Sequence, residues 1–223
     1  LAAGVVEGDL GRKPERIFLE WTDLPVAAAS IGQVHRAPTR DGRDVAVKVQ
    51  YPGVHEAIES DLDAAEAMYG MFSAMMLKGL DVNGLVDELR SRMREELDYS
   101  LEAKNVVEFE QRFAKHPWVR IPKLVPEYST ERLLTTEWVE GMSFDEFRKN
   151  ESAETKQRAG EVLWRFAQRA IHHYGIFNGD PHPGNYKFHH DGSITFLDYG
   201  LVKRWSPGEW EGLKPTMDAI IVH

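Results

Sequence analysis

The sequence predicts an α+β fold in two lobes, and three observations support this prediction. The first third is rich in β-branched residues and carries an Asp-Gly turn between two strand-like runs. The middle changes to apolar residues spaced three and four apart, a spacing typical of amphipathic helices. A second pair of strand-like runs, one long helix, a polar loop and a hairpin follow. Strands and helices are therefore grouped, and do not alternate as in a βαβ sheet.

Each element can be assigned in chain order. Strands are expected at 17–22, 33–37 and 44–50, followed by helices at 54–78 and 83–115. Two more strands are expected at 120–128 and 132–139, then a short helix after EGMSFDEF and a long one over 152–175 that ends at Gly175. The closing hairpin is expected at 186–189 and 193–197. We place an N-terminal lobe at residues 1–139 and a partial C-terminal lobe at residues 140–223.

Composition excludes several classes of function. The chain has 223 residues, is 42% hydrophobic and carries a formal net charge of −9. This acidic balance argues against a nucleic-acid partner, because phosphate backbones require a basic face. The absence of cysteine excludes disulfides, cysteine zinc sites and cysteine nucleophiles, and it fits a reducing compartment such as the cytoplasm.

The ends of the chain read as those of a fragment. The first residue is Leu, and the last segment, PTMDAIIVH, has the pattern of a helix that is cut within a turn. No apolar run approaches the roughly 20 residues that a membrane-spanning helix needs. For a fragment, this says little about membrane attachment or targeting of the full protein.

The stretch FNGDPHPGNYKFHHDGSITFLDYGLVKR, residues 177–204, carries the clearest chemistry. Asp180 is followed five positions later by Asn185, across a loop with two prolines. Asp198 then follows an apolar strand and precedes Tyr199–Gly200. Carboxylate and amide oxygens are ligands that Mg²⁺ prefers, and this spacing matches the catalytic and metal loops of kinases. The stretch therefore predicts a magnesium and phosphate site.

A lysine and a glutamate upstream could complete such a site. Lys48 lies in the strand VAVKVQ on the face opposite its valines. The segment REELDYSLEAKN offers Glu95, Glu96, Asp98 and Glu102 as its partner. Glu96 and Glu102 are six residues apart, so one continuous helix could not point both at a single spot.

Every one of these features also has a simpler explanation. A strand lysine can be an edge charge, an acidic helix a solvated face, and Asp-Tyr-Gly only a turn. The pairs His172–His173 and His189–His190 lack a third ligand at metal-binding spacing, and His182 is expected to make a structural hydrogen bond. The order of the pieces argues against the simpler explanations taken together, since a kinase fold requires this order.

The motifs resemble a known family. VAAASIGQVHRA, DVAVKVQYPGV, EELDYSLEAKN, EWVEG, NGDPHPGNY and FLDYGLVKR are similar to the UbiB/ADCK (aarF-domain) atypical kinase-like proteins over about residues 17–204. The resemblance implies a bilobal protein-kinase-like fold that binds ATP or ADP with Mg²⁺. It also implies atypical kinase or ATPase activity in isoprenoid-quinone (ubiquinone) biology or lipid homeostasis. The family's N-terminal K-x-G-Q extension and its C-terminal remainder, which carries membrane segments in many members, are not in this chain.

The resemblance also assigns roles in the N-terminal lobe. Lys48 would contact the phosphates, with Glu102 as its ion-pair partner. The segment from Glu137 to Val139 would be the hinge beside adenine. The alanine-rich nucleotide loop would consist of Ala27, Ala28, Ala29 and Ser30. Because this loop has alanines where typical kinases have glycines, its backbone is expected to approach phosphates less closely.

Further roles follow for the remaining motif residues. Glu96 and Asp98 would be the family's E-x-D pair near the active site. Asp180 would be the catalytic aspartate, with Asn185 and Asp198 as metal ligands. The reaction expected from these roles is phosphoryl transfer from ATP to water, a lipid or a quinone precursor.

Two alternatives remain open at the level of sequence. GDPHPGN and LDYG also resemble the aminoglycoside and choline phosphotransferases, which act on soluble small molecules. A nucleotide-gated scaffold without catalysis is the second alternative. For the full-length protein the expected location is cytoplasmic, with membrane association through segments outside this chain.

Overall fold

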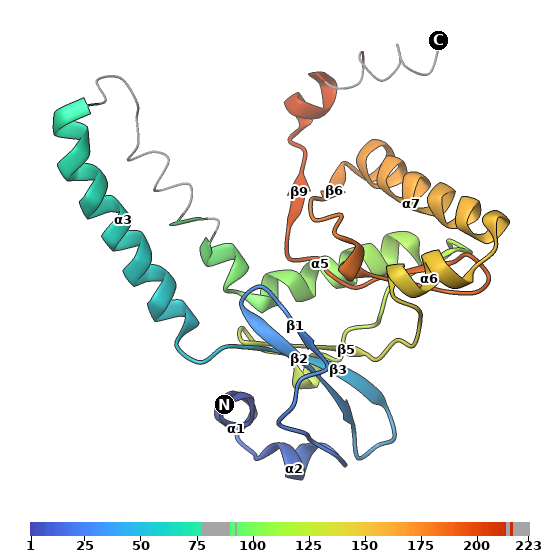
Figure 1. Ribbon diagram of the computed structural model, residues 1–223, viewed down its shortest axis with the longest axis horizontal. Helices are drawn as coiled ribbons and strands as arrows, with labels where there is room; N and C mark the ends of the chain where they lie inside the picture. Colours follow the sequence, from blue (N-terminus) through green and yellow to red (C-terminus); the bar gives the residue numbers. More distant parts are fainter. Residues whose placement is uncertain (77–89, 92, 213–214, 216–223) are drawn as a thin grey trace. The chain divides into compact units, whose positions relative to one another are not determined.

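The computed structural model describes residues 1–76, 90–91, 93–212 and 215 (Figure 1). Its helices are α1 (Ala2–Leu10), α2 (Pro14–Ile17), α3 (Val54–Met76), α5 (Tyr99–Phe113), α6 (Phe144–Asn150) and α7 (Ala153–Tyr174). Its strands are β1 (Ala27–Ala28), β2 (Gly32–Pro38), β3 (Asp44–Gln50), β4 (Val119–Arg120), β5 (Leu133–Glu137), β6 (Ile176–Asn178), β7 (Tyr186–Phe188), β8 (Ile194–Phe196) and β9 (Val202–Arg204). Two 3-10 turns, η1 (Pro126–Tyr128) and η2 (Pro183–Asn185), complete the set. The predicted α+β class is confirmed.

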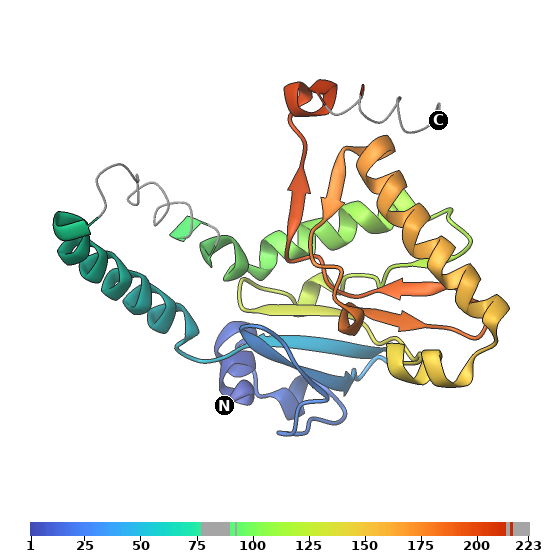
Figure 2. The same cartoon turned by 45° about the horizontal axis from the view of Figure 1, so that its top comes forward.

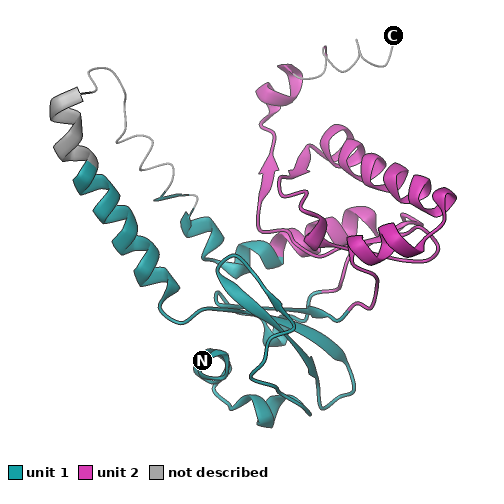
Figure 3. Cartoon of the chain, viewed as in Figure 1, with its two compact units in different colours: residues 1–103, 124–138 teal, residues 104–123, 139–223 magenta. Residues whose placement is uncertain are grey.

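The chain divides into two units, which Figure 3 colours separately. Unit 1 contains residues 1–103 and 124–138, and unit 2 contains residues 104–123 and 139–223. The lobes predicted at 1–139 and 140–223 differ from these units. Residues 104–123 instead belong with the later part of the chain, because Phe109 and Phe113 of α5 pack their rings against Phe166 of α7.

Unit 1 is built on a four-stranded antiparallel sheet with the order β1-β2-β3-β5. β2 and β3 form the hairpin that TRDGR predicted, and Gly42 in its turn has a φ of 89°, a conformation that side chains disfavour. The strands predicted at 33–37, 44–50 and 132–139 correspond to β2, β3 and β5. β3 is a central strand, so its side chains are held by neighbours on both sides.

The two faces of this sheet are different in character. On one face the three valines of β3 are fully buried and pack with Phe18 and with α1. The other face carries Lys48 and Gln50, and here Leu134 of β5 packs with the start of α5. Gln50 Nε2 donates a hydrogen bond of 2.6 Å to the carbonyl of Leu97. The predicted alternation along β3 is thereby confirmed.

The stretch 17–22 does not form the predicted strand. α2 covers its first residue, and Phe18 makes only an isolated bridge with Thr39. The ring of Trp21 stacks between Phe18 and His35, with centroid distances of 5.5 and 4.6 Å. These residues fill the core through ring packing and do not pair in the sheet, a difference that a short apolar run cannot reveal.

The strand predicted at 120–128 is also wrong for most of its length. Only β4 forms, and it pairs in parallel with β8. Pro122 and Pro126 lack the backbone N–H that a strand ladder requires, and Pro126 begins the turn η1.

The helix predicted at 83–115 is interrupted. Residues 90–91 and 93–96 are helical, the chain turns at Leu97–Asp98, and α5 then begins. Asp98 Oδ1 accepts hydrogen bonds from the Ser100 backbone N–H, at 2.9 Å, and from the Ser100 hydroxyl, as a helix cap does. Residues 83–89 and 92 lie outside the described residues. The helix predicted at 54–78 agrees with α3, apart from residues 77 and 78, which also lie outside them.

Unit 2 packs α7 against two small sheets, as Figure 2 shows. One sheet has the order β4-β8-β7 and the other pairs β6 with β9. α7 begins after the cap Ser152 and ends at Gly175, whose φ of 65° is left-handed, so the predicted helix at 152–175 is confirmed. The ring of Phe166 lies 3.7 Å from that of Phe196, which anchors the helix on β8.

Candidate functional site

A buried ion pair lies on the polar face of the sheet in unit 1. Lys48 Nζ lies 2.8 Å from Glu102 Oε2 and 3.1 Å from Oε1. The Glu102 side chain is 4% exposed and that of Lys48 15%. Since β3 is central, Lys48 is not an edge-strand charge. Burying two charges costs free energy unless their geometry is good. The short distances in this pair therefore indicate that the fold positions the two side chains for each other.

Tyr99 is a third member of this group that the sequence analysis did not assign. Its ring centroid lies 5.0 Å from Lys48 Nζ, within the range of a cation–π contact, and the side chain is 2% exposed. Tyr99 and Glu102 are three residues apart on α5 and therefore share a face. This spacing of three residues is the sequence signal that could have placed Tyr99 beside Lys48.

The alanine-rich loop lies beside this group. Ala27 and Ala28 pair with β2 and are exposed, and the backbone N–H of Ala29 donates to the carbonyl of Gly32 across a tight turn that includes the exposed Ser30. A Cβ on Gly32 would lie 2.3 Å from the Val49 carbonyl oxygen and 2.9 Å from the Tyr99 hydroxyl. Glycine is therefore required at position 32, which the sequence analysis did not include among the site residues.

The other residues predicted for the N-terminal lobe lie at ends of elements. Asp98 caps α5, as described above, and Glu96 is half-buried at the end of the preceding helical stretch. Because the chain turns at Leu97–Asp98, Glu96 and Glu102 do not lie on one continuous helix. Glu137 ends β5, and the chain passes from unit 1 to unit 2 just before Val139. The predicted hinge segment is thus the point where the chain changes unit.

A second group of predicted site residues lies in unit 2. Asp180 is exposed in the loop after β6, and Asn185 Nδ2 donates to its carboxylate Oδ2 at 2.8 Å. His182 Nδ1 accepts from the Gly184 backbone N–H at 3.1 Å, which is the structural hydrogen bond we expected. The bond between Asn185 and Asp180 fixes the loop across its two prolines.

Strand pairing brings Asp198 to the same place. Tyr186 of β7 pairs with Phe196 of β8, and the Leu197 backbone N–H donates to the Asn185 carbonyl at 2.9 Å. Asp198 follows directly, and its Oδ1 accepts from the Gly200 backbone N–H at 2.9 Å. Asp180, Asn185 and Asp198 are therefore gathered by one local segment.

The donor set of this segment fits Mg²⁺. Its candidate ligands are the carboxylate of Asp198 and the side-chain oxygen of Asn185, whose amide nitrogen is directed at Asp180. In the described ranges of the chain, no group of three or more His, Cys, Asp or Glu is arranged as a metal site. Mg²⁺ commonly binds through one or two side chains and completes its shell with water and substrate phosphates. Asp198 and Asn185 match this pattern of two side-chain ligands.

Two tyrosines beside these carboxylates keep their protons. Burial, together with the charge of Asp180, raises the pKa of Tyr186 to about 12. Burial and the charge of Asp198 raise the pKa of Tyr199 well above its ordinary value. Neither hydroxyl can therefore act as a base near neutral pH.

Two asparagines that the sequence analysis did not assign contact the Asp198 segment. Asn178 Nδ2 donates to the Asp198 carbonyl at 2.8 Å, and Asn178 Oδ1 accepts from the Asp180 backbone N–H at 3.2 Å. Asn105, which is 7% exposed, donates from Nδ2 to the Tyr199 carbonyl at 2.8 Å. No sequence signal pointed to Asn105, which lies far from Tyr199 along the chain.

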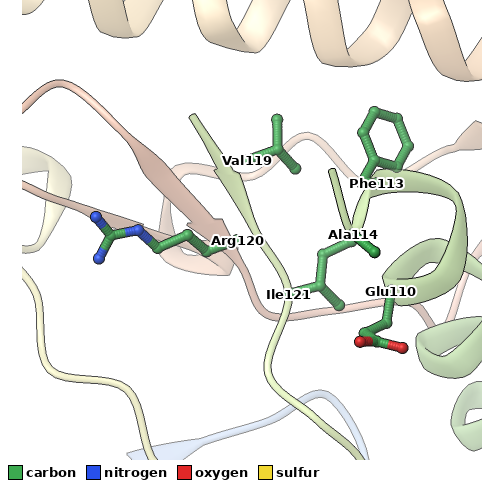
Figure 4. Close-up of a pocket in the computed structure, with 6 residues that line it drawn as sticks. All are labelled: Glu110, Phe113, Ala114, Val119, Arg120 and Ile121. Carbon is green, nitrogen blue, oxygen red and sulfur yellow. The ribbon is translucent and has the colours of Figure 1, made fainter. Parts of the chain in front are cut away.

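Two cavities of unit 2 are lined by none of the predicted site residues. One of about 190 Å³ lies between the end of α5 and β4, where Figure 4 shows Phe113, Val119 and Ile121. The other, of about 470 Å³, is lined by 116–118 and by residues of α7. Neither cavity enlarges the set of site residues.

The chain matches the sequence profile of the ABC1 atypical kinase-like domain over residues 1–221. It is 36% identical over 208 residues to an uncharacterized aarF domain-containing protein kinase of Arabidopsis thaliana, covering 93% of this chain. It is 35% identical over 212 residues to ACTIVITY OF BC1 COMPLEX KINASE 1 of the same plant, covering 91%. It spans only 29% and 30% of these two proteins. An uncharacterized Synechocystis protein is 32% identical over 228 residues, which cover 99% of this chain and 40% of that protein.

A solved structure is also similar. The complex of Rv3197 with erythromycin, from Mycobacterium tuberculosis, matches with a TM-score of 0.81 at 36% identity, covering 98% of this chain and 59% of that one. Together with the profile match, it supports the protein-kinase-like fold that the motifs implied. The names of both Arabidopsis relatives place them in the chloroplast. Within the described residues, no helix combines the length and apolar character that crossing a bilayer demands.

Proposed function

Because the chain belongs to the ABC1 atypical kinase-like family, we propose that it binds ATP or ADP with Mg²⁺ and uses ATP for phosphoryl chemistry, as part of a longer protein. The observation that carries this proposal is the buried pair of Lys48 and Glu102. Kinases contact nucleotide phosphates with a lysine that lies on a strand and is paired with a glutamate on a helix.

In unit 1, the proposal assigns the contacts to the nucleotide as follows. Lys48 would contact the phosphates, with its ammonium oriented by Glu102 and by the Tyr99 ring. The exposed turn after β1 would cover the nucleotide. Because Ala27 and Ala28 keep their methyl groups, the cover is expected to be looser than a glycine loop.

Three residues of unit 2 would perform the remaining tasks. Asp198 and Asn185 would hold Mg²⁺, which when bound neutralises the negative charge of the phosphates. Asp180 would accept the hydrogen bond of the acceptor hydroxyl and orient it toward the γ-phosphate. Asn185 would fix the Asp180 carboxylate through the hydrogen bond of 2.8 Å. Tyr186 keeps its proton near neutral pH, because burial and the charge of Asp180 raise its pKa to about 12.

We propose a lipid or an isoprenoid-quinone (ubiquinone) precursor as the acceptor, with water as the alternative acceptor in an ATPase. This follows from the resemblance of the motifs, and the ABC1 profile supports it at the level of the family. For the full-length protein we propose a cytoplasmic location with membrane association through segments outside this chain. The aminoglycoside and choline type of phosphotransferase, and a scaffold that binds nucleotide without turnover, remain the competing functions.

One experiment separates these functions. The full-length protein is incubated with Mg–ATP labelled at the γ-phosphate, with and without anionic liposomes, and both phosphate release and label transfer are measured. We expect turnover that liposomes or phenolic quinone precursors stimulate. Stimulation by aminoalcohols would favour the soluble phosphotransferase. Stabilisation by nucleotide in thermal unfolding without any turnover would favour the scaffold.

A further inference from the structure

We infer that Asn105 and Asn178 are positioning residues that set the conformation of the segment from Asp198 to Gly200 for metal binding. This inference rests on the proposed function, because it concerns the same Mg²⁺–nucleotide site. Its basis is that two asparagine side chains, from α5 and from the end of β6, donate to the consecutive carbonyls of Asp198 and Tyr199.

Asn178 connects the two aspartates of unit 2. Its single amide group donates to the Asp198 carbonyl and accepts from the Asp180 backbone N–H. Because an amide group is planar and rigid, these two bonds set the spacing between the two backbone segments. Asn178 is itself held at the end of β6, where it pairs with Val202 of β9, just beyond the Asp198 segment. The side chain therefore couples the position of Asp180 to that of Asp198.

Asn105 holds the next residue from the other side. While its Nδ2 donates to the Tyr199 carbonyl, its Oδ1 accepts from Arg204 Nη2 at 2.6 Å. Arg204 also contacts Glu108 at 2.6 Å, one turn further along α5. The hydrogen-bonding groups of Asn105 are thus both used, and the residue cannot swing away without breaking two bonds.

The ring of Tyr199 adds a third restraint. The side chain is fully buried, its centroid lies 4.9 Å from that of Phe109 on α5, and its hydroxyl donates to the Phe196 carbonyl at 3.2 Å. Together these contacts restrain the backbone carbonyls of Asp198 and Tyr199. The Asp198 carboxylate is therefore carried by a backbone segment that is held in one conformation. Residues that orient a metal ligand in this manner commonly change metal affinity about 10- to 100-fold when they are replaced.

The test measures metal dependence in binding, with no turnover involved. In the full-length protein, the affinity for a fluorescent ADP analogue is measured as Mg²⁺ is varied, and again in EDTA. The variants are Asn178→Asp and Asn105→Asp, which keep the accepting oxygen and remove the donor. Asn150→Ala, at the exposed end of α6, is the matched control.

We expect both aspartate variants to require about 10- to 100-fold more Mg²⁺ for half-maximal binding, with the affinity in EDTA changed less than about twofold. The control should behave as the wild type. Thermal unfolding of each variant shows whether it is folded. If one aspartate variant is not folded, the other one tests the inference. Asn178→Ala should match Asn178→Asp, because both lack the donor to Asp198.

Three results would overturn the inference. Wild-type Mg²⁺ dependence in both aspartate variants would overturn it and leave the proposed function standing. An equal loss of affinity with and without Mg²⁺ would indicate a general structural role. It would also overturn the inference and leave the proposed function standing. A wild-type protein that binds no nucleotide at any Mg²⁺ concentration would overturn the inference together with the proposed function.

Discussion

The two groups of candidate residues, one in each unit, are assembled in different ways. In unit 1, Lys48 and Glu102 are 54 positions apart, on a strand and on a helix, and they meet inside the fold. In unit 2, Asp180, Asn185 and Asp198 lie on one loop and one hairpin, and β7–β8 pairing gathers them. The first group depends on tertiary packing and the second on local structure.

This difference predicts how each group responds to change. Replacing a carboxylate in the loop after β6 or in the segment after β8 should affect ligand binding and leave the fold intact. Replacing a member of the buried pair in unit 1 should affect the fold as well, because it breaks an ion pair inside the fold. The following variants test this contrast in the full-length protein.

The largest effect is expected for Asp198→Asn. The amide keeps an oxygen that can accept from the Gly200 N–H but removes the negative charge for Mg²⁺. Turnover of Mg–ATP should fall by at least about a thousandfold, near 4 kcal/mol, while thermal unfolding stays unchanged. Asp145→Asn, on the exposed face of α6, is the control. Full turnover with unchanged Mg²⁺ dependence would remove Asp198 from the site.

Glu102→Ala should cost stability as well as binding. It removes the carboxylate that holds Lys48 Nζ in this buried pair, and we expect a loss of about 3 kcal/mol in the free energy of unfolding. The double variant Lys48→Met with Glu102→Leu should be less destabilised, since it removes both charges of the pair and leaves apolar side chains in their place. Urea unfolding measures both, with Glu110→Ala on the same helix as the control. The contrast between the groups fails if Glu102→Ala is as stable as this control.

Gly32→Ala tests the close approach beneath the alanine-rich loop. The added methyl would meet the Val49 carbonyl at 2.3 Å, and backbone atoms there cannot move freely. We expect a cost of about 2 kcal/mol in unfolding and weaker nucleotide binding. Gly4→Ala in α1, where nothing lies within 4 Å of the added atom, should be tolerated. Equal behaviour of the two variants would show that the sheet can relax at position 32.

The smallest effect concerns His35 in unit 1. Its Nδ1 lies 2.9 Å from the Thr22 carbonyl, to which it donates in the neutral ring, and Nε2 is buried with no partner among the described residues. Burial lowers the pKa of His35, and the Thr22 bond and the charge of Asp23 offset this only in part. The folded pKa is below the unfolded one, so its stability contribution is present above pH 6.5 and is lost as pH falls further.

The measurement is the slope of unfolding free energy between pH 7 and pH 5. His35→Asn should reduce this slope by up to about 1.4 kcal/mol per pH unit, the value for one proton. His55→Asn, at an exposed position of α3, is the control. His116, His172 and His189, whose pKa values burial also lowers, are present in every variant and do not bias the comparison. An unchanged slope in His35→Asn would contradict the prediction.

Much of the fold was predictable where local patterns are strong. The hairpin of β2 and β3, the helix α7 with its cap at Gly175, and the hairpin of β7 and β8 all follow from turn residues and periodicity. One failure occurred where tertiary packing overrode the pattern, and the other where prolines interrupted a strand-like run. Residues 17–22 pack as aromatic rings, and two prolines shortened the strand predicted at 120–128 to β4.

The candidate site divides in the same way. Spacing alone grouped Asp180, Asn185 and Asp198, because a short loop and a two-stranded hairpin leave few arrangements for them. Spacing could not choose among Glu95, Glu96, Asp98 and Glu102 as the partner of Lys48. The family resemblance named Glu102, and the geometry of the pair became visible only in the fold.

By itself, the sequence determined the fold class, the strand that carries Lys48 and the local carboxylate segment, since hydrophobic period, turn residues and short-range spacing act over a few residues. Only the tertiary structure decided that Asp98 caps a helix, that Tyr99 lies against Lys48, that Gly32 admits no side chain, and that Asn105 holds the Tyr199 carbonyl. Three of these four contacts join segments distant in sequence. The fourth, at Asp98, is local, but it required knowing where the chain interrupts a helix that periodicity alone would have continued.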